Sequence, residues 1–169
     1  MDSQSPQQSS SLHSQKNVNK GTSYYGTTVY LGSDIEFTSS LSNQFQPIGT
    51  ESRDFRGTFD GQGHVIRNLT ITTPSSSLYT GLFGYSGGTV TIKNLVMDSS
   101  CSVVSSAVSR YSYTYVGSVL GRCYTVNSGC LVENCVNMGS VTFSGSIKSD
   151  NLRLGGIAGN SVIPLSTRW

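Results

Sequence analysis

Residues 55–71, FRGTFDGQGHVIRNLTI, space their apolar side chains in a way that a straight strand does not explain. Near the end of this stretch, the apolar residues Ile66 and Leu69 are separated by a charged residue and an asparagine. Side chains of a straight strand alternate between two faces, so this spacing would leave one of the pair facing water. The same spacing returns in TIKNLVM and CLVENCV, residues 91–97 and 130–136. Three occurrences indicate a chain that bends at the same kind of point in successive repeats.

Asparagine is the residue that can supply the bend, because it tolerates the left-handed backbone conformation better than other non-glycine residues. A left-handed residue resets the alternation, so that both flanking apolar side chains point inward and the charged residue beside it points to solvent. We therefore predict that three asparagines stack in a ladder of hydrogen-bonded amides: Asn68, Asn94 and Asn134. The alternative is three unrelated surface turns. Asn68-Leu69-Thr70 is also a glycosylation sequon, and a glycan there would conflict with the ladder.

A second repeat supports the same architecture. TGLFG, GSVLG and GGIAG, at residues 80–84, 117–121 and 155–159, share a pattern of small residues, two apolar residues and a closing glycine. Such glycines suit tight corners where a Cβ would clash. The repeats predict an all-β fold, a right-handed parallel β-helix (solenoid) with irregular insertions. We expect coils of mid-twenties length, with residues 99–113 as one insertion.

Composition limits the chain to a single β-rich domain. Of its 169 residues only 12% are charged and 19 are glycine, a profile typical of turn-rich β structure. The Ser/Gln-rich residues 1–20 are expected to be disordered, residues 21–163 to form the β-helix domain, and residues 164–169 a tail that is a candidate truncation point. Within residues 27–40 an alternating pattern predicts these core side chains: Val29, Leu31, Ile35 and Phe37.

Charge and cysteine content exclude several classes of function. A net charge of +2 is too small for a nucleic-acid footprint, and no apolar run approaches the ~20 residues of a membrane span. No metal or other cofactor is expected, because the spacing of the four cysteines lacks zinc knuckles and has no nearby histidine. The expectation is buried thiols or one disulfide, with a Cys123–Cys130 bridge closing a loop in an oxidising compartment. The four cysteines are Cys101, Cys123, Cys130 and Cys135.

The repeated words also carry a family resemblance. TVYLGSDIEF, FQPIGT, FRGTFDGQGHVIRNLTI, YTGLFG, TIKNLVM, YVGSVLG, VENCVNMGSV and LGGIAG cover roughly residues 27–160. Their order resembles the GLUG-repeat β-helix region of bacterial-type surface adhesins and immunoglobulin A protease-like surface proteins. The resemblance implies an extracellular or cell-surface location, usually within a longer protein. The N-terminal residues lack the pattern of a secretory signal. The His-Glu-x-x-His motif of the protease branch is missing too, since the histidines are His13 and His64.

Two stretches compete as candidate functional sites. FDGQGH, residues 59–64, is similar to words found in polysaccharide-cleaving enzymes, whose general acid catalysis needs a second carboxylate. That enzyme alternative would use Asp60 with Asp54 or Glu51. Asp-Gly followed by glycine is also a strong turn signal, which is the interpretation favoured here, and His64 is expected to be a turn or solvent-facing residue.

RYSYTY, residues 110–115, is the candidate binding stretch. If it is extended, Tyr111, Tyr113 and Tyr115 lie on one face, where their rings would stack on sugars or on a partner protein. The alternative is packing of these rings against the flank of the domain. We therefore expect a non-catalytic module for adhesion or scaffolding, whose candidate partners are a glycan or a protein on a host or neighbouring cell surface.

Overall fold

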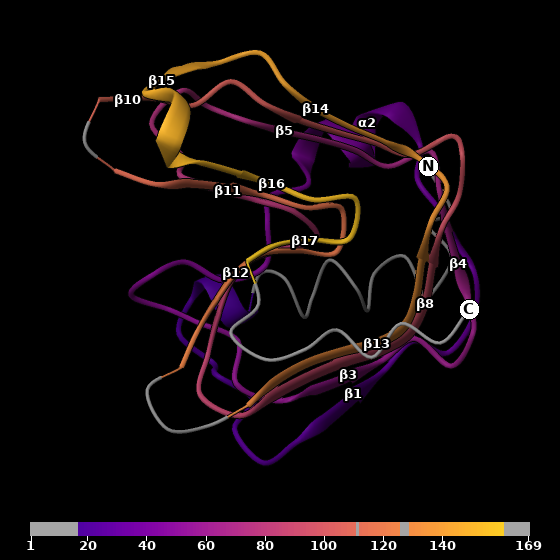
Figure 1. Cartoon of the computed structure of the whole chain (residues 1–169). Coiled ribbons are helices and arrows are strands. Elements are labelled where there is room, and N and C mark those ends of the chain that lie inside the picture. Colours follow the sequence, from indigo (N-terminus) through magenta and orange to yellow (C-terminus); the bar gives the residue numbers. More distant parts are fainter. Residues whose placement is uncertain (1–16, 111, 126–128, 161–169) are drawn as a thin grey trace.

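The computed structural model describes residues 17–110, 112–125 and 129–160. They form mostly short β-strands, and all pairs between the named strands are parallel. Figure 1 shows successive passes of the chain lying over one another, so that strands far apart in sequence become neighbours. The expected N-terminal and C-terminal tails lie outside the described residues, apart from residues 17–20.

The largest sheet contains six strands, in the order β1-β3-β8-β4-β2, with β13 pairing to β8. Its strands are β1 (Thr28–Tyr30), β2 (Ile35–Glu36), β3 (Thr58–Asp60), β4 (Val65–Arg67), β8 (Val90–Met97) and β13 (Cys130–Asn137). The long strand β8 pairs with β3 at one end and with β4 at the other. The shorter strands β3 and β4 are separated by the turn at residues 61–64.

Four smaller sheets complete the fold. Three of them have three strands each, namely β5 (Thr70–Thr73), β9 (Ser102–Ser105) and β14 (Ser140–Phe143); β6 (Tyr79–Thr80), β11 (Thr114–Val116) and β16 (Leu152–Leu154); and β7 (Phe83–Gly87), β12 (Leu120–Tyr124) and β17 (Ala158–Asn160). The fourth pairs β10 (Val108–Ser109) with β15 (Ser146–Ile147). Helix α2 (Ser39–Gln44) and the 3-10 helix η1 (Ser149–Asn151) interrupt the strands.

The prediction of a right-handed parallel β-helix with irregular insertions is wrong. The strands form five small, separate parallel sheets, and the described residues do not make a continuous closed solenoid. The left-handed Asn94 and Asn134 leave only a one-residue gap in the pairing of β8 with β13, and both strands continue through them. The strands are two to eight residues long, and the turns and loops between them keep backbone pairing from continuing from one sheet into the next. The sequence pattern indicated where the chain bends, but not how far pairing extends between bends.

The predicted repeat length is also wrong. Asp60 pairs with Lys93, 33 residues further on, and Cys130 pairs with Val90, 40 residues away. The mid-twenties estimate compared Asn68 with Asn94, which lie at different corners. Residues 99–113 are not an insertion in their described part, because β9 and β10 lie there and pair with strands of neighbouring passes.

The core is a column of side chains that lie in register from one pass to the next. Phe83 and Ala158 both pair with Leu120, and Ile48 forms an isolated bridge to Phe83. The pentamer repeats therefore stack on one another. The predicted core side chains Leu31, Ile35 and Phe37 are buried, and Val29 packs partly buried against them.

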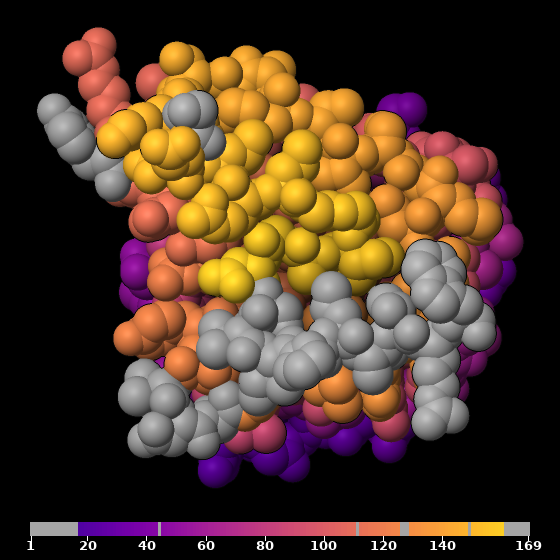
Figure 2. Space-filling model, in the orientation of Figure 1, coloured from indigo at the N-terminus to yellow at the C-terminus, as the bar shows by residue number. Residues whose placement is uncertain are grey.

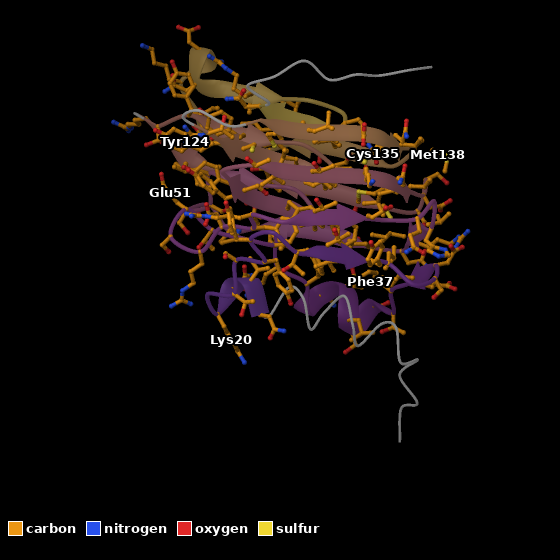
Figure 3. All side chains as sticks on the ribbon, turned by 90° about the horizontal axis from the view of Figure 1, so that it is seen from below. Lys20, Phe37, Glu51, Tyr124, Cys135 and Met138 are labelled. Atoms are coloured by element: carbon orange, nitrogen blue, oxygen red, sulfur yellow. The ribbon has the colours of Figure 1, made fainter. Side chains whose placement is uncertain are left out.

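Helix α2 and residues 17–19 cover one end of the stack. At this end, Thr38 caps α2 by accepting a hydrogen bond from the backbone amide of Leu41, and Leu41 and Phe45 are buried. Residues 17–19 are helical, and Val18 is only 1% exposed although the sequence assigned it to a disordered segment. Figure 3 shows Lys20 and Phe37 at this end and Met138 towards the other.

The last pass of the chain carries exposed apolar side chains at its edge. Val136, Met138 and Leu154 are each about half exposed. Figure 2 shows this pass, in orange to yellow, lying over the earlier ones. In the part of the chain that the structure describes, no helix is long and apolar enough to cross a membrane.

Candidate functional site

The most distinctive surface of the molecule is a cluster of tyrosines around one arginine. The guanidinium carbon of Arg122 lies 4.8 to 5.9 Å from four tyrosine ring centroids, those of Tyr115, Tyr124, Tyr79 and Tyr85. A second arginine, Arg153, lies 4.8 Å from the ring of Tyr113. We call these residues the tyrosine–arginine surface: Tyr79, Tyr85, Tyr113, Tyr115, Arg122, Tyr124 and Arg153.

Parallel pairing between passes assembles this surface. Tyr115 of β11 lies between Tyr79 of β6 and Arg153 of β16, while Arg122 of β12 lies beside Tyr85 of β7. Along β11 the side chains alternate, with Val116 in the core and Tyr115 on the outer flank. Residues 36 to 38 positions apart thereby meet on one flank. No short sequence motif predicts such contacts.

The rings contact one another as well as the arginines. Tyr79 and Tyr115 are stacked, with centroids 5.9 Å apart and an interplanar angle of 27°. Tyr79 meets Tyr85 edge to face at 5.0 Å, and Tyr113 lies 6.2 Å from Tyr115. Aromatic pairs at these separations contribute about 0.5–1.5 kcal/mol each beyond the burial of their area. The rings therefore stabilise one another in this arrangement without a ligand.

Hydrogen bonding leaves the cation of Arg122 largely unpartnered. Its Nη1 donates to the hydroxyl of Tyr79 at 3.4 Å, and its buried Nε has no acceptor among the described residues. Burial raises the pKa of Tyr79, and it raises the pKa of Tyr85 to about 12. Both phenols therefore stay neutral at physiological pH, and neither neutralises the arginine.

The predicted tyrosine row is only partly formed. Tyr111 lies outside the described residues, Tyr113 is 46% exposed and Tyr115 is 7% exposed. Tyr115 thus packs against the flank, as the alternative interpretation held, whereas Tyr113 faces solvent. Sequence reasoning missed the other members of the surface. Aligning the pentamers on their closing glycines, Gly84 and Gly121, would have placed Tyr85 opposite Arg122.

Asp60, the first carboxylate of the enzyme alternative, is held in a turn. Its Oδ1 accepts hydrogen bonds from Asn94 Nδ2 and from the backbone amide of Gln62, each at 2.9 Å, and Lys93 Nζ lies 3.6 Å from its Oδ2. The hydrogen bond from Asn94, followed by that from Gln62, lowers the pKa of Asp60. Gln62 and Gly63 have positive φ angles, as a tight turn requires. This environment favours the structural interpretation of Asp60, because a general acid needs a raised pKa.

The other two candidate carboxylates have different neighbours. Asp54 forms an ion pair with Arg56 at 2.9 Å, and its Oδ2 lies against the backbone of Gly87. Glu51 is exposed. The contacts of Asp54 and Asp60 therefore do not bring them together around a common site. Within the described ranges, no group of three His, Cys, Asp or Glu side chains is arranged to hold a metal ion.

A charge cluster that the sequence did not reveal surrounds Asp34. Its Oδ1 lies 3.2 Å from His64 Nδ1 and accepts from the backbone amide of Val65 at 3.0 Å, while its Oδ2 accepts from Arg67 at 2.8 Å. The hydrogen bond from Arg67 is the main cause that lowers the pKa of Asp34 to about 2. The sequence suggested no acid that would orient His64, because the two residues are 30 positions apart.

The three asparagines all adopt the predicted left-handed conformation, with φ angles between 50° and 57°. Asn134 Nδ2 donates to Asn94 Oδ1 at 3.3 Å, so these two amides stack. Asn68 is elsewhere: its Nδ2 donates to Glu36 Oε1 at 3.0 Å, and its backbone amide donates to Ser100 Oγ at 2.9 Å. In the sequon, both Asn68 and Thr70 are exposed.

All four cysteines are free thiols. Three are buried and Cys135 is half-buried. A hydrogen bond with Cys123, together with burial, raises the pKa of Cys130 far above its usual range. Burial also raises the pKa of Cys101, and it raises that of Cys135 to about 11. The structure thus has the buried thiols of the sequence expectation, with Cys123 and Cys130 in contact.

No family model matches the chain, and no solved structure matches it. The chain is similar to halomucin of Haloquadratum walsbyi (strain DSM 16790 / HBSQ001), with 26% identity over 155 residues. The alignment covers 88% of this chain and 2% of halomucin, so the chain spans a very small part of that protein's length.

Proposed function

We propose that this chain is a non-catalytic recognition module of a cell-surface or secreted protein, and that it binds glycans through the tyrosine–arginine surface. The observation that carries the proposal is the position of Arg122 among four tyrosine rings on the outer flank of the stacked strands. Tyrosine rings offer flat apolar faces with a polar edge, which suits contact with the faces of sugar rings.

The surface location is supported by two similarities. The alignment with halomucin, a protein named as a mucin, covers most of this chain. The repeated words resemble those of GLUG-repeat surface proteins, which are large adhesins. Both similarities favour a role as one part of a longer extracellular protein.

The arrangement of the parallel strands also suits recognition of a ligand. Parallel pairing holds the side chains of β6, β11 and β16 in register, so equivalent positions form rows on the flank. The hydrogen-bonded environment that lowers the pKa of Asp60 disfavours the alternative, a polysaccharide-cleaving enzyme. A binding module needs no titrating group, only a preorganised surface.

Glycan binding by the purified chain tests this proposal. We expect binding on a glycan array, and we expect Tyr113→Ala and Tyr124→Ala to weaken it at least tenfold. Tyr25→Ala is the matched control, because Tyr25 is 77% exposed and lies outside the tyrosine–arginine surface. Equal binding by wild type and by both surface variants would contradict the proposal. So would release of shortened oligosaccharides that Asp60→Asn abolishes.

A further inference from the structure

We infer that the tyrosine–arginine surface selects glycans that carry a carboxylate, such as those containing uronic or sialic acids. This inference rests on the proposed glycan binding and names the ligand class. It starts from Arg122, whose guanidinium has five N–H donors in a rigid plane that matches the two oxygens of a carboxylate. The acceptor described for these donors is the Tyr79 hydroxyl, at 3.4 Å.

The charge of Arg122 is not neutralised by a neighbouring acid in the described part of the chain. The ion pairs there involve other side chains, those of Arg56, His64, Arg67 and Lys93. Burial is the main cause that raises the pKa of Tyr79 and Tyr85, and the nearby charge of Glu51 adds to it, yet Glu51 makes no described ion pair with Arg122. A half-buried cation that lacks a carboxylate partner favours an anionic ligand, because its charge is weakly screened by water.

Arg153 provides a second cation on the same surface. Its Nη1 donates to the backbone oxygens of Asp150 at 2.9 Å and Leu152 at 3.1 Å, which fixes the guanidinium over the ring of Tyr113. Tyr113 and Tyr115 lie between the two arginines, with Arg122 over Tyr115 and Arg153 over Tyr113. A glycan that stacks on the exposed Tyr113 would contact Arg153 directly and lie one ring away from Arg122.

The rest of the chain favours a sugar carboxylate over a polyphosphate. Nucleic acids bind through many phosphate contacts and require a strongly basic face, whereas the net charge here is +2. One or two guanidinium groups among aromatic rings suit one or two carboxylates per binding site. Arginine–carboxylate pairs with two parallel hydrogen bonds supply orientation as well as affinity.

Matched pairs of sugars separate this inference from the proposed function. Titration calorimetry would compare oligogalacturonate with its methyl ester, and sialyllactose with lactose. We expect at least one acidic member to bind tenfold or more tightly than its neutral partner. Raising NaCl from 50 to 500 mM should reduce that preference, because a partly exposed ion pair is screened by salt.

Three variants test which groups provide the preference. Arg122→Gln and Arg153→Gln should each reduce the ratio of acidic to neutral sugar affinity at least fivefold. Arg122 is half-buried, so its replacement can disturb folding. Arg153 is exposed, so Arg153→Gln tests the same effect without that complication. Glu51→Gln should raise the ratio, because it removes a negative charge near Tyr79 and Tyr85. Equal binding of acidic and neutral sugars, lost in Tyr113→Ala, would overturn the inference and leave the proposed function standing. Binding of neither member of any pair would overturn both.

Discussion

The Nδ2 of Asn134 donates a hydrogen bond to the Oδ1 of Asn94 across 3.3 Å, although the two residues are 40 positions apart in the chain. Asn94 in turn donates to the Oδ1 of Asp60 at 2.9 Å. Three successive passes of the chain are thus joined through side chains at one corner. At this corner the strands β3, β8 and β13 are in register, so the side-chain bonds continue the backbone ladder.

Asn94→Ala should lower the free energy of unfolding by about 3–5 kcal/mol. The left-handed conformation costs alanine about 1–2 kcal/mol, and the two side-chain hydrogen bonds, one of them to the carboxylate of Asp60, together contribute about 2–3 kcal/mol. Asn94→Gly is the matched control, because glycine accepts the same backbone angles and removes only the side-chain bonds. Urea unfolding followed by circular dichroism measures both values. Equal losses for the two variants would show that backbone strain plays no part at this corner.

Asp34→Asn should make the melting temperature fall less steeply as the pH is lowered from 5 to 2. The carboxyl of Asp34 has its pKa lowered from 3.8 to about 2 in the folded protein, chiefly by the hydrogen bond from Arg67. A lowered pKa gives stability that is fully present above pH 3.8 and is lost as the pH falls towards 2. Thermal unfolding between pH 5 and 2 tests this for wild type and variant.

The control for this experiment is Glu51→Gln, which removes an exposed carboxylate that makes no described hydrogen bond. The wild-type melting temperature should fall more steeply with acid than that of Asp34→Asn, while Glu51→Gln should follow the wild type. Some acid sensitivity should persist in Asp34→Asn, since hydrogen bonds also lower the pKa of Asp60 and Asp98. Parallel curves for wild type and Asp34→Asn would refute a stabilising role for this carboxylate.

Gly121→Ala should destabilise the protein by about 2 kcal/mol or more. A Cβ at this position would lie 2.7 Å from the backbone oxygen of Gly84 and 2.9 Å from the backbone nitrogen of Thr80, neither of which can move freely. Overpacking of this kind forces backbone shifts that cost about 1–3 kcal/mol. Gly156→Ala is the matched control, because a Cβ there meets nothing within 4 Å. If Gly121→Ala were as stable as this control, the close stacking of the pentamer repeats would be wrong.

The left-handed backbone conformation of the asparagines could be predicted from the sequence, whereas the extent of pairing between strands could not. Ile66, Leu69, Ile92 and Leu95 are all buried, because the left-handed asparagines reset the alternation as predicted. Which corners lie above one another depends on the number of residues between them, and Asn68 and Asn94 share a motif without sharing a position. The single closed solenoid inferred from the repeats failed for the related reason that sheet continuity depends on long-range register.

The candidate site shows the same limit. Tyr113 and Tyr115 alternate within one short stretch of sequence, whereas the place of Arg122 depends on pairing between passes. That pairing puts Tyr115 beside Tyr79 and Arg122 beside Tyr85. His64 and Asp34 met in the same way, across 30 residues of chain. Contacts between passes depend on small differences in loop length, which a single sequence does not reveal.

The thiols should react slowly in the folded protein. At pH 8 a thiol whose pKa is about 11, such as Cys135, is only about 0.1% thiolate, and it is the thiolate that reacts with iodoacetamide. The other three cysteines are buried, so reagent reaches them only when the structure opens. Protein purified under reducing conditions should therefore show little modification within minutes by intact mass, and four modifications in 6 M guanidinium. An unfolded mass that is 2 Da lighter and takes only two modifications would reveal a disulfide instead, for which Cys123 and Cys130 are the candidates because their thiols are in contact.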